Sequence, residues 1–452
     1  MVPAAHGGVD EIRKSDGALV RRIRPFGDDA SVFLVGPPAA AGEIVYYTAI
    51  ALVPGNAWGA DVAGAWLVRM DRDGAVTKVA WNTLPLGAPA SDAPCEIRFS
   101  LSTLPWPPSP TAVAPTLPCG AQRPAVGAGP AVGADGAVYL VSRAQFNARY
   151  GYVVSLNPDL SFRWAASLRG RLADGCDVTV PGNGTPGGCR AGTTTGVDPA
   201  TNAPPAARVD DTSSAGPVPL PGGGVLYGAH TRYNYSQGHL MEFGPAGNFE
   251  GAYGFGWDST PALAPHGGTF SIVLKENHYE VGSYCNDSNF CPTPRSIVTP
   301  TDPEAYFLTR LSPSLAVESQ FQNFNTESCM RAEGGELTCV EDHPGGFEYC
   351  VNVAAVDVDG TVYANSEDGN LYAVDPAGEL TGRTFLDSAA GAAYTPVGIG
   401  PDGVVYAQNL GHLVAVAPVG GRRPCAGPGS EGSRGGVCAS PTPSPAIVGP
   451  GR

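Results

Sequence analysis

Ionisable and aromatic side chains gather in two stretches that interrupt otherwise apolar sequence. The first is HTRYNY at residues 230–235 and the second is KENHYE at residues 275–280. Clusters of Tyr, Arg and His on loops are typical of surfaces that bind polar ligands or partner proteins, although ordinary solvated loops are the alternative. His230, His278 and Glu280 have side chains that can bind a metal, but no pair among them has the spacing that would demand one.

Motifs of the common catalytic classes do not occur in the sequence. There is no GxSxG, no P-loop, no GxGxxG with a following helix and no Ser/His/Asp constellation. Two Asp-x-Asp-Gly sequences, at residues 71–74 and 357–360, resemble the start of a calcium loop. They lack the further oxygen ligands and the distal Glu of such loops. Because Asp-Gly is the preferred pair in tight hairpins, we interpret both as turns.

The eleven cysteines lie in Gly- and Pro-rich insertions. Cysteines that bracket loops are typical of disulfides formed in an oxidising compartment, and no CxxC or CxxCH occurs that would indicate zinc, thioredoxin or haem chemistry. The disulfide candidates are Cys95, Cys119, Cys176, Cys189, Cys285, Cys291, Cys329, Cys339, Cys425 and Cys438. One thiol is left over in the group that also contains Cys350. The N-terminus lacks the apolar region of a signal peptide, yet the cysteines favour a periplasmic or extracellular protein.

One phrase is repeated in residues 351–420. In both copies a short apolar strand is followed by an Asp-Gly turn, a strand with Val-Tyr-Ala, and a strand that ends at an Asp-Pro or Ala-Pro turn. Tyr363 and Tyr406 hold the same position in the two copies, about 43 residues apart. A period of about 40–50 residues built from short strands is the signature of a propeller blade. The sequence therefore predicts an all-β fold, a β-propeller of four-stranded blades.

Weaker copies of this phrase extend over most of the chain, at residues 30–84, 129–170, 213–256 and 257–323. The last copy has three strands, and Ala18–Phe26 is available as its fourth. Joining the two chain ends in one blade would close the ring and remove its exposed sheet edges. We predict six blades within residues 1–420, with seven or eight as the alternative. A Gly/Ser/Pro-rich tail is predicted over residues 421–452.

Long insertions occur only between the second and third strands of a blade or between blades. Since strands alternate in direction, both classes of connection lie on one face. Loops that a rigid scaffold positions commonly carry function, although neutral insertion at tolerant sites is the alternative explanation. We expect binding on this loop-bearing face, with residues that precede first strands around the mouth of the central channel. The predicted ligand- or partner-binding residues are Arg232, Tyr233, Tyr235, His278, Glu280, Asp211, Trp257, Asp258 and Tyr394.

The charge of the chain bears on its partners. A formal net charge of −15 disfavours nucleic acid and anionic membranes, since both need a basic face. No hydrophobic run is long enough to cross a bilayer, so no transmembrane segment is predicted. We expect a soluble monomer.

Three phrases, LYAVDPAGELTGRTF, LVRMDRDGAVTKVAW and VVSLNPDLSFRW, resemble the repeat of pyrroloquinoline-quinone (PQQ)-like propellers. Trp81 and Trp164 match the Trp that ends this repeat. The resemblance covers about residues 9–420, but the terminal Trp is absent from the other copies. Quinone-dependent dehydrogenases of this class carry adjacent cysteines over the cofactor, and this sequence has no Cys-Cys pair. The resemblance therefore fits the non-enzymatic branch, which includes outer-membrane assembly lipoproteins and binds partner proteins.

These observations together predict an exported, non-catalytic propeller without a cofactor. It would bind a protein or a glycan through its loop-bearing face. The alternative is an enzyme with its site at the channel mouth. That enzyme would be an oxidoreductase dependent on PQQ or calcium, or a six-bladed lactonase or lyase.

Overall fold

The computed structural model describes residues 1–100, 107–173, 175–176, 178, 189–212, 215–231, 237–256, 259–278, 305–349, 351, 353–392 and 394–417. Strands dominate these residues, and their single helical element is the 3-10 turn η1 (Trp81–Thr83). No helix in the described part of the chain is long and apolar enough to cross a membrane. The predicted tail over residues 421–452 lies outside the described residues.

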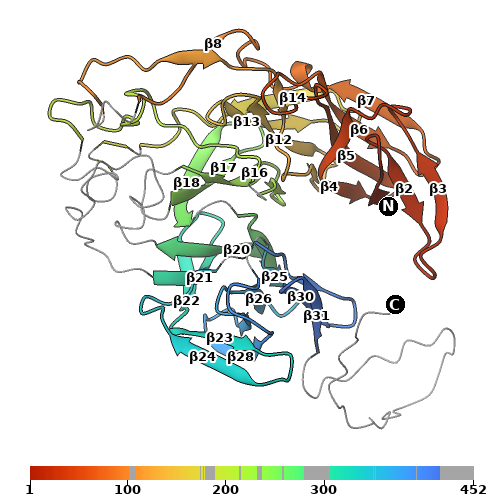
Figure 1. Cartoon of the computed structure of the whole chain (residues 1–452), viewed down its shortest axis with the longest axis vertical. Helices are drawn as coiled ribbons and strands as arrows, with labels where there is room; N and C mark the ends of the chain where they lie inside the picture. The colour runs from red at the N-terminus through yellow and green to blue at the C-terminus, as the bar shows by residue number, and fades with distance from the viewer. Residues whose placement is uncertain are drawn as a thin grey trace.

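Seven antiparallel sheets of three to five strands follow one another along the described residues, and we number them blades 1 to 7. Blade 1 consists of β1 (Val2–Pro3), β2 (Val9–Ile12) and β3 (Leu19–Ile23). Blade 2 consists of β4 (Val32–Ala41), β5 (Ile44–Ala51), β6 (Gly64–Met70) and β7 (Val76–Ala80). Blade 3 consists of β10 (Gln122–Pro124), β11 (Ala131–Val132), β12 (Val138–Ala144), β13 (Gly151–Leu156) and β14 (Phe162–Ser167). Blades 4 and 5 consist of β15 (Val218–Pro219), β16 (Val225–His230), β17 (Gln237–Phe243) and β18 (Phe249–Gly256); and β19 (Ala262–His266), β20 (Thr269–His278), β21 (Ala305–Leu311) and β22 (Val317–Gln322). Blades 6 and 7 consist of β25 (Ala355–Val356), β26 (Val362–Asn365), β27 (Asn370–Val374) and β28 (Leu380–Phe385); and β29 (Gly398–Ile399), β30 (Val405–Asn409) and β31 (His412–Val416). Figure 1 shows the blades in chain order around an arc.

The propeller architecture is confirmed, but the predicted count of six blades is wrong. The additional sheet is blade 1, whose outer strand β3 was expected to complete the last blade. Instead β3 pairs with β2, and β2 pairs with β1. Among the described strands no pairing joins blade 1 to blade 7, so the predicted shared blade is not formed there. The sequence did not indicate this sheet because β1 contains only two residues and carries no alternating pattern.

Five-residue turns of one kind join the third and fourth strands of blades 2 to 6. In residues 375–379 the N–H of Asp375 donates to the carbonyl of Glu379 and the N–H of Gly378 donates to the carbonyl of Asp375, both at 3.0 Å. The same two hydrogen bonds recur in residues 71–75, 157–161, 244–248 and 312–316. The fourth residue of each turn has a positive φ; these residues are Gly74, Leu160, Gly247, Leu315 and Gly378. This is the three-residue hairpin loop with a bulge, and in blades 3 to 6 the strand register shifts beside it.

Apolar side chains from neighbouring blades pack face to face and form the core. The two tryptophans of the predicted repeat each dock on the next blade. The indole N–H of Trp81 donates to Ser142 Oγ at 2.9 Å, and that of Trp164 donates to the carbonyl of Pro245 at 2.8 Å. Burial of an aromatic ring with its polar atom satisfied stabilises each junction between blades.

Candidate functional site

The second strands of the blades end on the loop-bearing face, and their last residues differ around the arc. β16 and β20 end on His230 and His278, whereas β26 and β30 end on Asn365 and Asn409. Each of the four side chains has a hydrogen-bond partner on the same face. The polar groups on this face therefore depend on the blade.

His278 forms a close pair with Glu276 on the same face of β20. Its Nε2 lies 2.6 Å from Glu276 Oε1, while Glu276 Oε2 accepts hydrogen bonds from Tyr253 at 2.7 Å, Thr309 at 2.6 Å and Gln320 at 2.9 Å. Burial alone would raise the pKa of Glu276, but the hydrogen bonds from His278, Thr309 and Tyr253 outweigh it and lower that pKa. A carboxylate held in this way fixes the tautomer of the histidine, as general bases and metal ligands require.

Blade 4 carries a second histidine–carboxylate pair. His230 Nδ1 lies 3.4 Å from Asp210 Oδ2, and Arg208 donates to Asp210 Oδ1 at 3.0 Å. Burial would raise the pKa of Asp210, but the hydrogen bond with His230 and the charge of Arg208 hold it below its ordinary value. Asp210 therefore stays ionised at neutral pH.

The predicted residue Asp211 binds two arginines of blade 3. Arg123 donates from both terminal nitrogens, at 2.7 and 2.6 Å, and Arg143 donates at 3.0 Å. The backbone N–H of Val126 donates to the same carboxylate at 3.1 Å. Burial would raise the pKa of Asp211, but these hydrogen bonds and positive charges lower it. Asp211 thus joins blade 3 to the segment that leads into blade 4.

Three predicted residues lie in the described part of the chain. Tyr394 lies beside Lys275, whose ammonium is 5.5 Å from the centre of the tyrosine ring. Lys275 and Glu276 are consecutive in β20, so their side chains lie on opposite faces of that strand. Tyr394 is therefore on one face with Lys275, and His278 is on the other with Glu276. Asp211 lies in the arginine cluster. The structure thus places the three in separate polar groups. The other predicted residues lie outside the described residues; they are Arg232, Tyr233, Tyr235, Trp257, Asp258 and Glu280.

Two insertions on the loop-bearing face pack together into one unit. We call the described residues of 93–119 and 189–208 the stapled platform. The first insertion contains the pair β8 (Pro94–Glu96) and β9 (Thr116–Pro118), closed by the Cys95–Cys119 disulfide. The second begins at Cys189, which forms a disulfide with Cys176. All four cysteines are among the disulfide candidates of the sequence.

Direct contacts join the two halves of the platform. Phe99 and Ala114 form a small buried cluster with Ala200, and the N–H of Phe99 donates to the carbonyl of Ala200 at 2.8 Å. The amide of Asn202 donates to the carbonyls of Pro110 at 2.9 Å and Ala112 at 3.1 Å.

An ion pair anchors the platform to blade 3. Arg169 donates to Glu96 at 2.6 Å and lies over the ring of Tyr150. The platform therefore has a fixed shape and a fixed position on the loop-bearing face.

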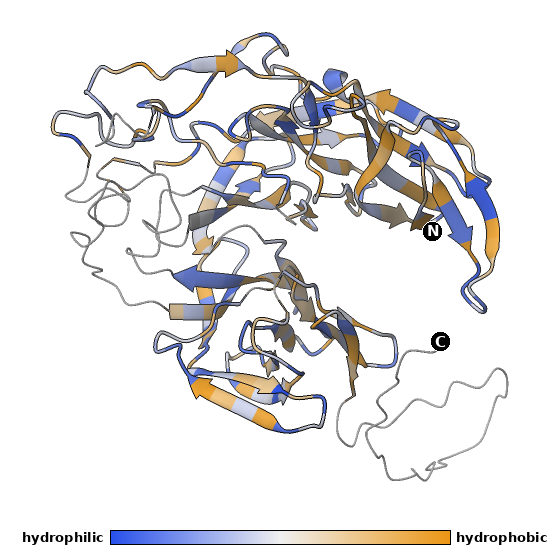
Figure 2. Cartoon of the chain, viewed as in Figure 1, coloured by the Kyte–Doolittle hydropathy of each residue, from blue (hydrophilic) through white to orange (hydrophobic). Residues whose placement is uncertain are grey.

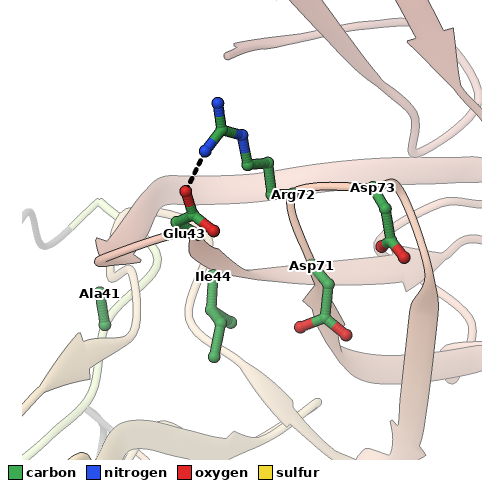
Figure 3. A pocket seen from close by; sticks show the side chains of 6 residues that line it. All are labelled: Ala41, Glu43, Ile44, Asp71, Arg72 and Asp73. Carbon is green, nitrogen blue, oxygen red and sulfur yellow. Dashed lines mark hydrogen bonds and ion pairs between the residues drawn. The ribbon is translucent and has the colours of Figure 1, made fainter.

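The opposite, plain face contains an open hollow of about 810 Å³ beside the turns of blade 2. Its lining residues are Ala41, Glu43, Ile44, Asp71, Arg72 and Asp73, shown in Figure 3. Glu43 is paired with Arg72, Asp71 lies 2.7 Å from Arg69, and Asp73 accepts the N–H of Ala75 at 3.0 Å. The carboxylates of this hollow thus serve ion pairs and the turn, in agreement with the reading of residues 71–74 as a turn.

The PQQ-like resemblance makes a quinone with calcium the alternative cofactor. Calcium takes about six to eight oxygen ligands. Within the described ranges, no three His, Cys, Asp or Glu side chains gather in a way that could hold a metal ion. We therefore derive no chemical step through this cofactor.

Comparisons with known proteins find low similarity. The chain matches no protein-family model and no curated protein sequence. Among solved structures it is similar to a europium-containing methanol dehydrogenase, with 12% identity and a TM-score of 0.40 over 89% of this chain and 70% of that one. It is also similar to BamB from Moraxella catarrhalis, with 10% identity and a TM-score of 0.35 over 91% of both chains. The Dos1 propeller gives 11% identity and a TM-score of 0.33 over 85% of this chain and 88% of that one. At these values the similarity carries no argument about function.

Sequence reasoning missed Glu276, Arg123 and Arg143. The insertion was expected to begin at Asn277, directly after Glu276, but β20 continues to His278 because it pairs with β21 as far as Ala305. The alternation of Glu276 and His278 within the strand was the available signal. Arg123 and Arg143 meet Asp211 from 88 and 68 residues away, a contact that no local pattern indicates.

Proposed function

We propose that this propeller is an exported, non-catalytic module that binds a partner protein through its loop-bearing face. The observation that carries the proposal is the stapled platform, in which two insertions, each with its own disulfide, pack against each other on that face. Ordering two long loops costs conformational entropy. A surface ordered in advance binds a partner without a further ordering cost, which supports a binding role.

The disulfides support export. Cys95–Cys119, Cys176–Cys189 and Cys329–Cys339 are formed in the described part of the chain. Disulfides form and persist in oxidising compartments and are rare in the cytosol. We therefore place the protein in the periplasm or outside the cell.

A matched pair of exposed valines tests the proposal. Val113 in the platform is 88% exposed, and Val358 in a turn of the plain face is 97% exposed. Each would be replaced by the photo-crosslinking residue p-benzoylphenylalanine, in the full chain expressed in its source cells. We expect a discrete crosslinked protein from position 113 and none from position 358. Because the two sites differ little in exposure, the difference would report the face that binds.

Two results would contradict the proposal. Equal crosslinking from both positions would show that contact is nonspecific. Quinone-dependent dye reduction by the purified protein would favour the oxidoreductase instead. A triple change at Arg232, Tyr233 and Tyr235 is expected to reduce the specific crosslink from position 113.

A further inference from the structure

A second disulfide-closed element stands on the loop-bearing face between blades 5 and 6. It consists of β23 (Glu327–Arg331) and β24 (Leu337–Glu341), joined by the Cys329–Cys339 disulfide, and we call it the ribbon. Every residue from Met330 to Val340 is exposed. The exposed fractions of Met330, Leu337 and Val340 are 59%, 47% and 58%. Figure 2 shows hydrophobic residues along this pair of strands.

One edge of the ribbon is docked on the propeller. The N–H of Arg331 donates to the carbonyl of Asp387 at 2.9 Å, and the N–H of Ala389 donates to the carbonyl of Cys329 at 2.8 Å. These bonds fix β23 against the segment that leads from blade 6 to blade 7. The outer strand of the ribbon is therefore β24.

The hydrogen-bond pattern identifies the groups on the outer edge. In the turn, the N–H of Ala332 donates to the carbonyl of Glu336 at 2.8 Å, so these two residues form a hydrogen-bonded pair. From this pair onward, non-hydrogen-bonded and hydrogen-bonded pairs of β23 and β24 residues alternate. Thr338 and Val340 then bond inward to β23. Leu337, Cys339 and Glu341 point their N–H and C=O groups away from β23. No described backbone group pairs with this edge.

The charge of the ribbon selects among occupants of this edge. The acidic residues between 327 and 342 are Glu327, Glu333, Glu336, Glu341 and Asp342, against Arg331 as the basic residue. Pairing of two copies through β24 would bring like charges together across the new strand pair, which is destabilising. A cationic strand would instead place opposite charges in those positions.

We propose that the β24 edge of the ribbon binds an extended, cationic segment of a partner protein as an added strand. The segment would bond to the N–H and C=O groups of Leu337, Cys339 and Glu341. Its apolar side chains would lie beside Thr338 and Val340 on one face of the ribbon, and its Lys or Arg side chains would lie beside Glu341 on the other face. This inference rests on the proposed protein-binding function and concerns a surface separate from the stapled platform.

A labelled peptide of alternating lysine and valine serves as the probe, and one of alternating glutamate and valine is its control. We expect the full-length protein to bind the first at least about tenfold more tightly than the second. Amide hydrogen exchange read by NMR should slow at Leu337, Cys339 and Glu341 when the lysine peptide is bound. The inward amides of Thr338 and Val340 should change less, because they are already bonded.

Two variants separate backbone pairing from charge. Glu341→Pro removes one outward N–H together with the charge of the side chain. Glu341→Gln removes the same charge but keeps the N–H. We expect Glu341→Pro to weaken binding of the lysine peptide about tenfold more than Glu341→Gln does. If Glu341→Pro disturbs the ribbon, the double variant Glu336→Lys with Glu341→Lys is used instead. In that variant the preference between the two peptides should reverse.

Three results would overturn the inference. These are no binding of the lysine peptide, binding without slower exchange at the three outward amides, and a concentration-dependent dimer that Glu341→Pro abolishes. Each leaves the crosslink from Val113 as an independent test of the proposed function. The two proposals can therefore fail separately.

Discussion

Blades 4 and 5 and blades 6 and 7 end their second strands in different ways. In blade 7, Asn409 accepts the N–H of Ser388 and donates to its carbonyl, both at 3.0 Å. In blade 6, Asn365 donates to Thr395 Oγ1 at 2.9 Å. Blades 4 and 5 have histidine–carboxylate pairs at the corresponding ends. In blades 6 and 7 a neutral amide at the end of the second strand holds the segment between blades in place. In blades 4 and 5 an ionisable histidine–carboxylate pair occupies the corresponding end.

Blade 5 shows that these two roles are separable. Asn277 accepts the N–H of Tyr349 at 3.2 Å and donates to its carbonyl at 3.3 Å, much as Asn409 does with Ser388. His278 follows directly and pairs with Glu276 instead. The linker is thus fastened without the histidine, so His278 is not needed for that contact. Buried charged groups are weak evidence for stability, which makes this pair a candidate for function.

The largest effect is expected from the amide that fastens blade 7. Asn409→Ala would leave the buried N–H of Ser388 without a partner and would leave its carbonyl with the N–H of Gly391 alone, at 3.3 Å. At about 1–3 kcal/mol for each of the two lost hydrogen bonds, we expect the free energy of unfolding to fall by about 4 kcal/mol. Urea denaturation measures this, with the exposed neighbour Gln408→Ala as a control that stays within about 0.5 kcal/mol. Equal losses of unfolding free energy in Asn409→Ala and Gln408→Ala would show that the Asn409 amide does not hold blade 7 in place.

Removing the platform disulfide should affect the platform and blade 3 but not blades 6 and 7. The Cys95–Cys119 bond closes a separation of 24 residues, for which the chain-entropy model gives about 3.5 kcal/mol. We expect Cys95→Ala with Cys119→Ala to lower stability by roughly that amount and to speed amide exchange in β8 and β9. Amide exchange in β26 and β30 is the internal control. Faster exchange there as well would show that the two regions unfold together.

Acid should weaken blade 4 before blades 6 and 7. Burial lowers the pKa of His239 from 6.5 to about 4, so its contribution is fully present above pH 6.5 and is lost as the pH falls toward 4. The loss is about 3 kcal/mol. The lowered pKa values of Asp210 and Glu276 act in the same direction at still lower pH. Stability against pH for His239→Gln, with the exposed His412→Gln as control, measures the effect. A wild-type slope in His239→Gln would contradict it.

The smallest effect is expected when the histidine at the end of a second strand is replaced by the asparagine found in blades 6 and 7. His278→Asn removes one hydrogen bond to Glu276, which keeps its bonds from Tyr253, Thr309 and Gln320. We expect a loss of about 1 kcal/mol in the free energy of unfolding. Thermal denaturation checks this against Asn277→Ala, which should cost more because it frees the backbone of Tyr349. The reverse order would show that the histidine fastens the linker.

The sequence predicted best what is encoded locally. The five-residue turns and the disulfides depend on residues close together along the chain, and both were expected. The pairing of β1 with β2 and the contacts of Asp211 with Arg123 and Arg143 depend on groups brought together by the fold. The end of β20 was placed too early because Lys275, Glu276 and Asn277 are polar, although they are buried through partners in neighbouring strands. Polar residues at a strand end resemble a loop until those partners are known.

The five-residue turns also decide where the chain tolerates new sequence. Each holds its strands in register through two backbone hydrogen bonds and one residue with a positive φ, so a single added residue would move every following side chain to the other face of its blade. On the opposite face, doubling the length of a flexible loop costs only about 0.6 kcal/mol. An inserted peptide is therefore expected to be tolerated better in a loop of that face than within residues 375–379.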